Sequence, residues 1–174
     1  KRDGSFLVAR KKMPNFSYND LKGTEILGGR KGGVPLMTFE YVLKEKGLTI
    51  GENLKAGNVN VRTDVQFGVM AGAFAGGEGD FTTAFEPTAT AMEKEGSGYI
   101  VTSIGKDSGE IPFTAYSTTR SYMKNNKDLI QRFTNAVYKG QLWIQQASSK
   151  EVAKAMQPFF EDISLEDLTT VVDR

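Results

Sequence analysis

The chain of 174 residues is long enough to bury one sizeable hydrophobic core, or one domain together with part of a second. Its 22 Lys and Arg nearly balance 21 Asp and Glu, so its charge gives no general argument for a nucleic acid or an anionic membrane as partner. Because the sequence holds neither Cys nor His, it excludes disulfides, the Ser-His-Asp triad, the Cys-His pair and metal sites built from those residues.

Two short apolar segments begin the chain. Residues 6–10 predict a strand that ends at a polar connection, and residues 24–27 predict a second strand. A glycine-rich turn follows, and Pro35 then suits the first position of a helix that continues to about Lys46. Apolar residues recur at helical spacing along this helix, and Gly47 is typical of a helix end.

Strands and helices go on alternating after this helix. The next predicted strands are residues 58–62, 80–85 and 99–103. Between them we expect a helix capped by Asp64, with Phe67 on its buried face, and a helix from Pro87 to about Glu95. This order of elements favours the α/β class, with a parallel sheet and right-handed crossovers.

The pattern changes after a polar turn near residue 108. Residues 111–117 are predicted to be extended, and no strand is predicted beyond them. A helix over residues 128–147 carries an apolar stripe that includes Trp143, a capping box of Ser148 and Glu151 begins another helix, and a third follows near Ser164. These helices have no sheet of their own in this sequence. Either they fold back on the first unit, or they belong to a second lobe whose sheet is mostly missing.

A candidate ligand site lies where the second strand meets its helix. The turn is rich in glycine and carries Arg30 and Lys31, and no Ser, Thr, Asp or Asn stands before Pro35 to cap the helix. Free backbone N–H groups at such a helix start, with two cations beside them, suit a polar or anionic ligand. The alternative is a tight strand-to-helix turn that needs glycine for its backbone angles and binds nothing.

A second junction, at residues 84–88, has the same form. There Glu86 either accepts hydrogen bonds from a ligand amine or hydroxyl, or stabilises the N-terminus of its own helix. Gln66 is a weaker third candidate, and the aromatic rings of Phe113 and Tyr116 either stack on a ligand or pack internally. The glycine-rich turn matches neither a P-loop nor the G-x-G-x-x-G fingerprint, so NTP hydrolysis and hydride transfer have no support.

Four segments in this order resemble the extracytoplasmic solute-binding proteins of ABC importers, and in particular the NMT1/THI5-like family: DLKG at 20–23, GGRKGGVP at 28–35, GAFAGGEGD at 72–80 and FEPTA at 85–89. The resemblance implies a periplasmic-binding-protein type II-like lobe with a mostly parallel sheet flanked by helices, plus the C-terminal helices of a second, incomplete lobe. Residues 1–16 would then be a strand and crossover segment from the other lobe, residues 17–110 the complete α/β lobe, and residues 111–174 the return strand and C-terminal helices.

The resemblance also implies where the ligand binds. The family's first ligand-facing junction matches Gly29, Arg30, Lys31, Gly32, Gly33 and Val34, and its second matches Phe85 and Glu86. Together with Gln66, these are the predicted ligand-binding residues, and no catalytic residue, metal or cofactor is expected. Sulfonate and nitrate binders commonly have small hydroxyl residues at the first junction, whereas this chain has two cations there.

The function implied is capture of a small polar or anionic solute between two lobes, in the sulfonate, nitrate, taurine or thiamine-precursor class. The implied partners are that solute and the permease subunits of an importer, outside the cytoplasmic membrane. The chain begins with neither Met nor a signal peptide, so we expect any targeting segment or lipid anchor to lie outside it. Two alternatives share the fold: an enzyme of thiamine-pyrimidine or menaquinone biosynthesis, and the effector domain of a LysR-like regulator.

Overall fold

A five-stranded sheet forms the centre of the first of two units in the computed structural model, which describes residues 2–174. This unit ends at Phe113, and the second comprises Thr114–Arg174. The strands of the first unit are β1 (Ser5–Ala9), β2 (Glu25–Leu27), β3 (Asn60–Arg62), β4 (Phe81–Phe85) and β5 (Tyr99–Ser103). Its helices are α1 (Val34–Glu45), α2 (Met70–Ala75), α3 (Thr88–Glu95) and α4 (Ile104–Ser108), with short 3-10 turns η1 (Tyr18–Leu21), η2 (Leu54–Ala56) and η3 (Phe67–Val69).

The sheet has the strand order β3-β2-β4-β1-β5. β2 pairs in parallel with both β3 and β4, whereas β1 is antiparallel to its two neighbours, β4 and β5. Four strands therefore point one way and β1 alone points the other way. The predicted α/β class, with a mostly parallel sheet flanked by helices, is confirmed.

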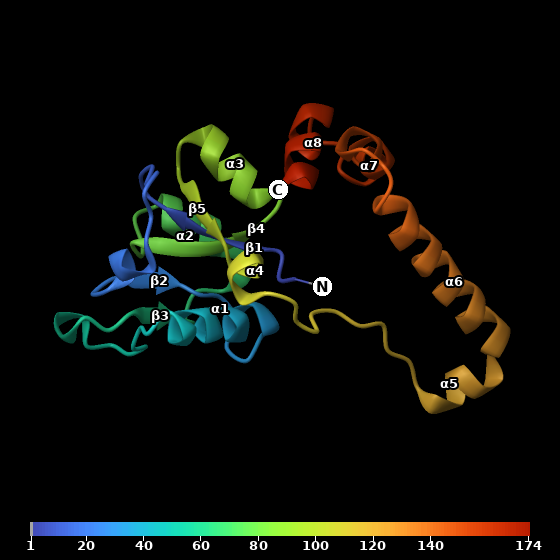
Figure 1. Cartoon of the computed structure of the whole chain (residues 1–174), viewed down its shortest axis with the longest axis horizontal. Helices are drawn as coiled ribbons and strands as arrows, with labels where there is room; N and C mark the ends of the chain where they lie inside the picture. The colour runs from blue at the N-terminus through green and yellow to red at the C-terminus, as the bar shows by residue number, and fades with distance from the viewer. Residues whose placement is uncertain (1) are drawn as a thin grey trace. The chain divides into compact units, whose positions relative to one another are not determined.

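Helices cover both faces of this sheet (Figure 1), and β1 shows how the core is divided between them. Successive side chains of a strand point to opposite faces. Leu7 belongs to one buried cluster with Phe39 of α1, and the next residue, Val8, belongs to the other with Phe74 of α2. Ile104 of α4 joins the first cluster and Met92 of α3 joins the second. β1 is thus an apolar central strand, buried on both sides.

The structure differs from the sequence-based description at three points. Residues 1–16 were assigned to the other lobe, but β1 lies in the middle of this sheet, because its apolar residues fill both cores. Asp64 does not cap a helix, since its carboxylate accepts hydrogen bonds from Arg62 Nε at 3.0 Å and Nη2 at 2.7 Å. The helix after β3 consequently begins only at Met70. Residues 111–117 were predicted to be an extended return segment, and they form no strand.

The second unit contains helices and no strand among the described residues. It contains α5 (Arg120–Asn125), α6 (Lys127–Ile144), α7 (Ser149–Met156), the 3-10 turn η4 (Gln157–Phe159) and α8 (Leu165–Asp173). The predicted capping box is present, because the Glu151 carboxylate accepts the Ser148 backbone N–H at 2.8 Å. α7 and α8 pack against each other. Among the helices that the structure describes, none is both long and apolar enough to cross a membrane.

The apolar stripe of α6 is predicted to face inward, but α6 has no buried residue. The side chain of Trp143 is 45% exposed, and Leu129, Phe133 and Ile144 are exposed as well. This helix therefore shows the periodicity of a buried helix without the burial. The periodicity indicates that one face of α6 is apolar enough to be buried, but it does not indicate which other part of the protein would cover that face.

The hydroxyl of Tyr18 forms a partly buried hydrogen-bond network in the first unit. It donates to Asp107 Oδ2 at 2.6 Å, and Thr102 Oγ1 donates to the same oxygen at 2.7 Å. Burial, and then the hydrogen bond to Asp107, raises the pKa of Tyr18 well above its usual value.

Replacing Tyr18 with Phe is therefore expected to reduce the free energy of unfolding by about 1–2 kcal/mol at pH 7. The raised pKa also predicts a pH dependence. Above about pH 10 the tyrosine of the unfolded chain loses its proton while the folded one keeps it, so stability falls as the pH rises. Urea titrations between pH 7 and 11 test this. The Tyr18→Phe variant should lose less stability above pH 10 than the parent. Tyr41→Phe, at an exposed position, should change neither the stability at pH 7 nor the loss of stability above pH 10. Equal alkaline losses in all three proteins would contradict the assignment.

Candidate functional site

The carboxyl ends of the parallel strands β2, β3 and β4 meet at one edge of the sheet. Leu27 and Arg62, the last residues of β2 and β3, pair with each other, and Leu27 also pairs with Thr82, three residues before the end of β4, so the three strands run toward the same edge. In open α/β sheets, ligands bind at this edge. The two junctions singled out in the sequence follow β2 and β4, and they lie at this same edge, as expected for parallel neighbours.

Backbone hydrogen bonds fix the first junction. Gly28 N–H donates to the Arg62 carbonyl at 2.9 Å, and Gly33 N–H donates to the Arg30 carbonyl at 3.0 Å. Gly29 has a φ of 91°, a conformation that side chains disfavour. At Gly28, a Cβ would lie 2.4 Å from Val61 Cγ1, so only glycine allows this close approach.

The helix that follows this junction begins without a side-chain cap. Gly33 stands at the cap position, α1 begins at Val34, and Pro35 occupies its first turn. Arg30, Lys31, Gly32 and Val34 are exposed, and neither cation has an ion-pair partner among residues 2–174. Gly29 is buried and Gly33 is half-buried. The other first-junction residues form an exposed turn with two cations beside an uncapped helix start, an arrangement suited to an anion. Ligand contact with them stays a prediction.

The second junction differs from the first because Glu86 acts on its own helix. Its carboxylate accepts hydrogen bonds from the Thr90 backbone N–H at 2.9 Å and from Thr90 Oγ1 at 3.0 Å. α3 begins at Thr88, with Pro87 at the cap position. Of the two roles considered for Glu86, the hydrogen bonds to Thr90 correspond to the local one, in which the carboxylate stabilises its own helix. Any ligand would have to share this carboxylate with Thr90.

Phe85 joins a group of three aromatic rings at this edge. The ring centroids of Phe67 and Phe85 are 5.8 Å apart in an edge-to-face arrangement, and those of Phe85 and Phe113 are 6.3 Å apart. Gly4 lies next to this group, because a Cβ there would be at an ordinary contact distance of 3.6 Å from Phe85 Cδ1. Gln66, the third candidate, is exposed beside Phe67, and its carbonyl accepts the Val69 N–H at 3.0 Å.

Sequence reasoning missed Phe67 as a residue of this edge. Its spacing with Met70 and Phe74 predicted a place on the buried face of a helix, but Phe67 lies in the 3-10 turn before α2 and is 54% exposed. The available signal was Gly68, next to it, which disfavours a continuous helix.

An ion-pair group flanks this edge beyond β3. Arg62 Nη2 lies 2.7 Å from Asp64 Oδ2 and 2.9 Å from Glu78 Oε2. The hydrogen bond from Arg62 is the main cause that lowers the pKa of Asp64. Both carboxylates are therefore paired with the same arginine, and both stay more than half exposed. Among residues 2–174, no group of three or more acidic side chains is arranged to hold a metal ion.

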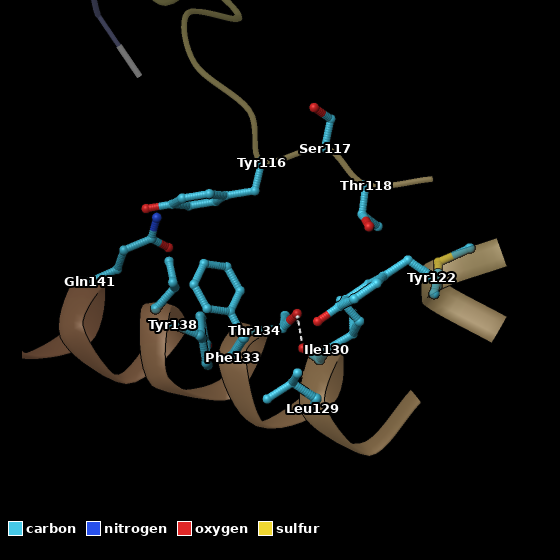
Figure 2. Close-up of a pocket in the computed structure, with 12 residues that line it drawn as sticks. Tyr116, Ser117, Thr118, Tyr122, Leu129, Ile130, Phe133, Thr134, Tyr138 and Gln141 are labelled. Carbon is cyan, nitrogen blue, oxygen red and sulfur yellow. Dashed lines mark hydrogen bonds between the residues drawn. The ribbon is translucent and has the colours of Figure 1, made fainter. Parts of the chain in front are cut away.

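The second unit contains a separate apolar pocket of about 760 Å³ (Figure 2). The segment at residues 116–118 and helices α5 and α6 line it, and Figure 2 shows the ring of Tyr116 above α6. The ring centroids of Tyr116 and Phe133 are 4.9 Å apart, edge to face. Tyr116 is predicted either to stack on a ligand or to pack internally; its ring contacts Phe133, but the residue is 78% exposed, so it is not part of a core.

Comparison with known proteins gives two matches. Residues 17–157 match the NMT1-like family. Over 172 residues, the chain is 38% identical to a Bacillus subtilis (strain 168) protein named "Putative binding protein YtlA". That alignment covers 99% of this chain and 50% of the Bacillus protein, so the chain spans about half the length of this relative.

Proposed function

This chain belongs to the NMT1-like family, and from that premise we propose that it binds a small polar or anionic organic solute as part of an ABC importer. The name of the Bacillus relative supports a binding role, and the family match supports the resemblance to solute-binding proteins. The finer assignments are part of the proposal: an extracytoplasmic location, delivery of the solute to permease subunits, and a solute of the sulfonate, nitrate, taurine or thiamine-precursor class.

One observation carries the proposal. The loop at residues 29–34, in which Arg30 and Lys31 are exposed, ends at the uncapped start of α1, at the sheet edge toward which the three parallel strands run. Backbone N–H groups at a helix start bind anions, and Arg30 and Lys31 add two positive charges that no described residue neutralises. This loop offers donors and positive charge for a ligand.

The mechanism follows from differential affinity. A solute that touches this loop on one side and a facing surface on the other would stabilise the arrangement in which both surfaces contact it. The permease would then recognise that arrangement. The chain spans about half the length of its relative. That a facing surface exists is therefore part of the proposal.

Thermal denaturation with a panel of sulfonates, carboxylates, nitrate and pyrimidines tests the binding function. A bound solute raises the melting temperature in proportion to the logarithm of its concentration. Chromatography of the solute after incubation then separates a binding protein from an enzyme. The proposal requires a rise in melting temperature with at least one solute that is recovered unchanged. A solute that is consumed, or a panel without any shift, would overturn it.

Replacing Arg30 with Ala should weaken the binding of an anionic solute from this panel by roughly three- to tenfold. Arg30 is exposed and its side chain supports no described contact, so the fold should be unchanged. Isothermal titration calorimetry measures the change, which should shrink as salt screens the charge. Lys44→Ala, near the other end of α1, is the matched control and should bind as the parent does. If Arg30→Ala and Lys44→Ala bind the anion with equal affinity, Arg30 does not contact the solute.

A further inference from the structure

Arg62, the last residue of β3, contacts three connections of the first unit. Its backbone carbonyl accepts the N–H of Gly28, which begins the first junction, at 2.9 Å. Its guanidinium group donates to the carboxylate of Asp64, in the segment that leaves β3, and to that of Glu78, in the turn that leads into β4. One residue therefore joins the first junction, the segment after β3 and the turn before β4.

The turn that carries Glu78 is itself held in place by Arg10, which follows β1. The Arg10 guanidinium donates to three backbone carbonyls, those of Phe74 at 2.9 Å, Glu78 at 2.7 Å and Gly79 at 2.8 Å. Its Cζ also lies 4.3 Å from the centroid of the Phe74 ring. Because the backbone of this turn is fixed by several contacts, the Glu78 carboxylate is a well-placed partner for Arg62.

The segment that leaves β3 is held on the other side of Arg62. Asp64 accepts two hydrogen bonds from the guanidinium, from Nε at 3.0 Å and from Nη2 at 2.7 Å, and a bidentate contact of this kind fixes orientation as well as distance. Val65 packs against the buried cluster that contains Phe74. Gln66, one of the predicted ligand-binding residues, comes next and is exposed. Arg62 and the core therefore fix the direction in which this segment reaches Gln66.

We propose that Arg62 is a positioning residue of the solute site, which holds Gln66 in place at the candidate edge without touching the solute. This inference rests on the proposed binding function and adds a residue to it. The guanidinium of Arg62 is paired with two carboxylates, whereas Arg30 and Lys31 have no ion-pair partner among residues 2–174. The loop cations are thus the ones available to an anion, and Arg62 serves the geometry of the edge.

Direct contact and positioning predict opposite effects when a carboxylate is removed. If Arg62 bound the anion directly, Asp64→Asn or Glu78→Gln would release its guanidinium and strengthen anion binding. The loss of a negative charge close to an anion site would also strengthen binding. If Arg62 acts by position, the same variants loosen the segment that carries Gln66 and weaken binding. The sign of the change therefore separates the two roles.

The test measures the affinity of the full chain for methanesulfonate by calorimetry, or for the anion of the solute panel that raises the melting temperature most. Arg62→Met keeps a long side chain without donors and should weaken binding roughly three- to tenfold. Asp64→Asn and Glu78→Gln should each weaken it by about two- to threefold. Lys55→Met, which removes an exposed cation from η2, is the matched control and should bind as the parent does.

Two further readouts separate positioning from a general loss of stability. The melting temperatures of the variants should change by about 4 °C or less, because both ion pairs of Arg62 involve carboxylates that are more than half exposed. In a double-mutant cycle, Gln66→Ala should weaken binding by itself, and Arg62→Met should have less effect in Gln66→Ala than in the parent. Arg62→Lys keeps the charge with a single donor group and should restore part of the affinity.

Several outcomes would overturn the inference. Stronger binding in Asp64→Asn or Glu78→Gln would make Arg62 a direct contact, and unchanged binding in Arg62→Met would give it no role. Additive effects in the cycle, or no effect of Gln66→Ala, would show that Arg62 does not act through Gln66. If the parent binds no anion of the panel, the proposed function falls together with this inference. Circular dichroism establishes that each variant is folded, and the two exposed carboxylate variants decide the question if Arg62→Met does not fold.

Discussion

Replacing Phe39 with Ala is expected to reduce the free energy of unfolding by about 3–5 kcal/mol. Phe39 is completely buried on α1 and packs in the cluster that also contains Leu7 of the central strand. Removing its ring would leave a cavity between helix and sheet that rigid neighbours can fill only in part. Because domains of this size are stable by only about 5–15 kcal/mol, this is a large share of the total. Urea unfolding followed by far-UV circular dichroism measures the change.

Trp143→Ala provides the contrast for this prediction. Its periodicity on α6 resembles that of a core residue, but it is 45% exposed on a helix without any buried residue. We therefore expect a loss of about 1 kcal/mol or less. A loss as large as that of Phe39→Ala would show that the α6 surface is covered in solution. A small loss in Phe39→Ala would contradict the core described for the first unit.

Replacing Gly105 with Ala is expected to destabilise the first unit by about 3 kcal/mol or more. A Cβ at this position would lie 1.8 Å from the Asp3 carbonyl oxygen and 3.0 Å from the Asp3 nitrogen. These are backbone atoms of a buried residue, and Asp3 Oδ1 also accepts a hydrogen bond from the Ser5 N–H at 2.7 Å. The methyl group can therefore enter only if the segment before β1 separates from α4.

Gly72→Ala is the matched control for Gly105→Ala. Gly72 lies inside α2, and a Cβ there would meet nothing within 4 Å. Since Ala favours a helix interior over Gly, this variant should be neutral or more stable by up to about 1 kcal/mol. Thermal unfolding compares the two variants. Similar melting temperatures for both would mean that Asp3 does not pack against Gly105 in solution.

The strands of the first unit could be predicted because each is a short apolar run bounded by polar or glycine residues. The place and direction of β1 could not be predicted in the same way. An apolar run such as residues 6–10 predicts a buried strand, but it does not predict which strands pair with it. β1 pairs with β4 and β5, and this pairing depends on a fit between side chains far apart in the sequence. Periodicity alone contains no such information.

The candidate site could be predicted only where local chemistry determines it. The glycines and the uncapped start of α1 were readable because they depend on neighbours in the chain. The competition for Asp64 was not, since Arg62 reaches its carboxylate through a side-chain geometry that no spacing rule contains. α2 begins only at Met70, so Phe67 lies in the 3-10 turn before it and is exposed.

The central position of β1 has a consequence for the order in which the first unit assembles. β2 and β3 are near one another in sequence and can pair as soon as both exist. Leu7, in contrast, pairs with Thr83 and Thr102, so both of its partners leave the ribosome much later. Until then this apolar strand has no ladder partner and is a segment that chaperones or other nascent chains can capture. β1 therefore waits for β4, and β5 can join the sheet only through β1, so the speed of folding depends on these long-range steps.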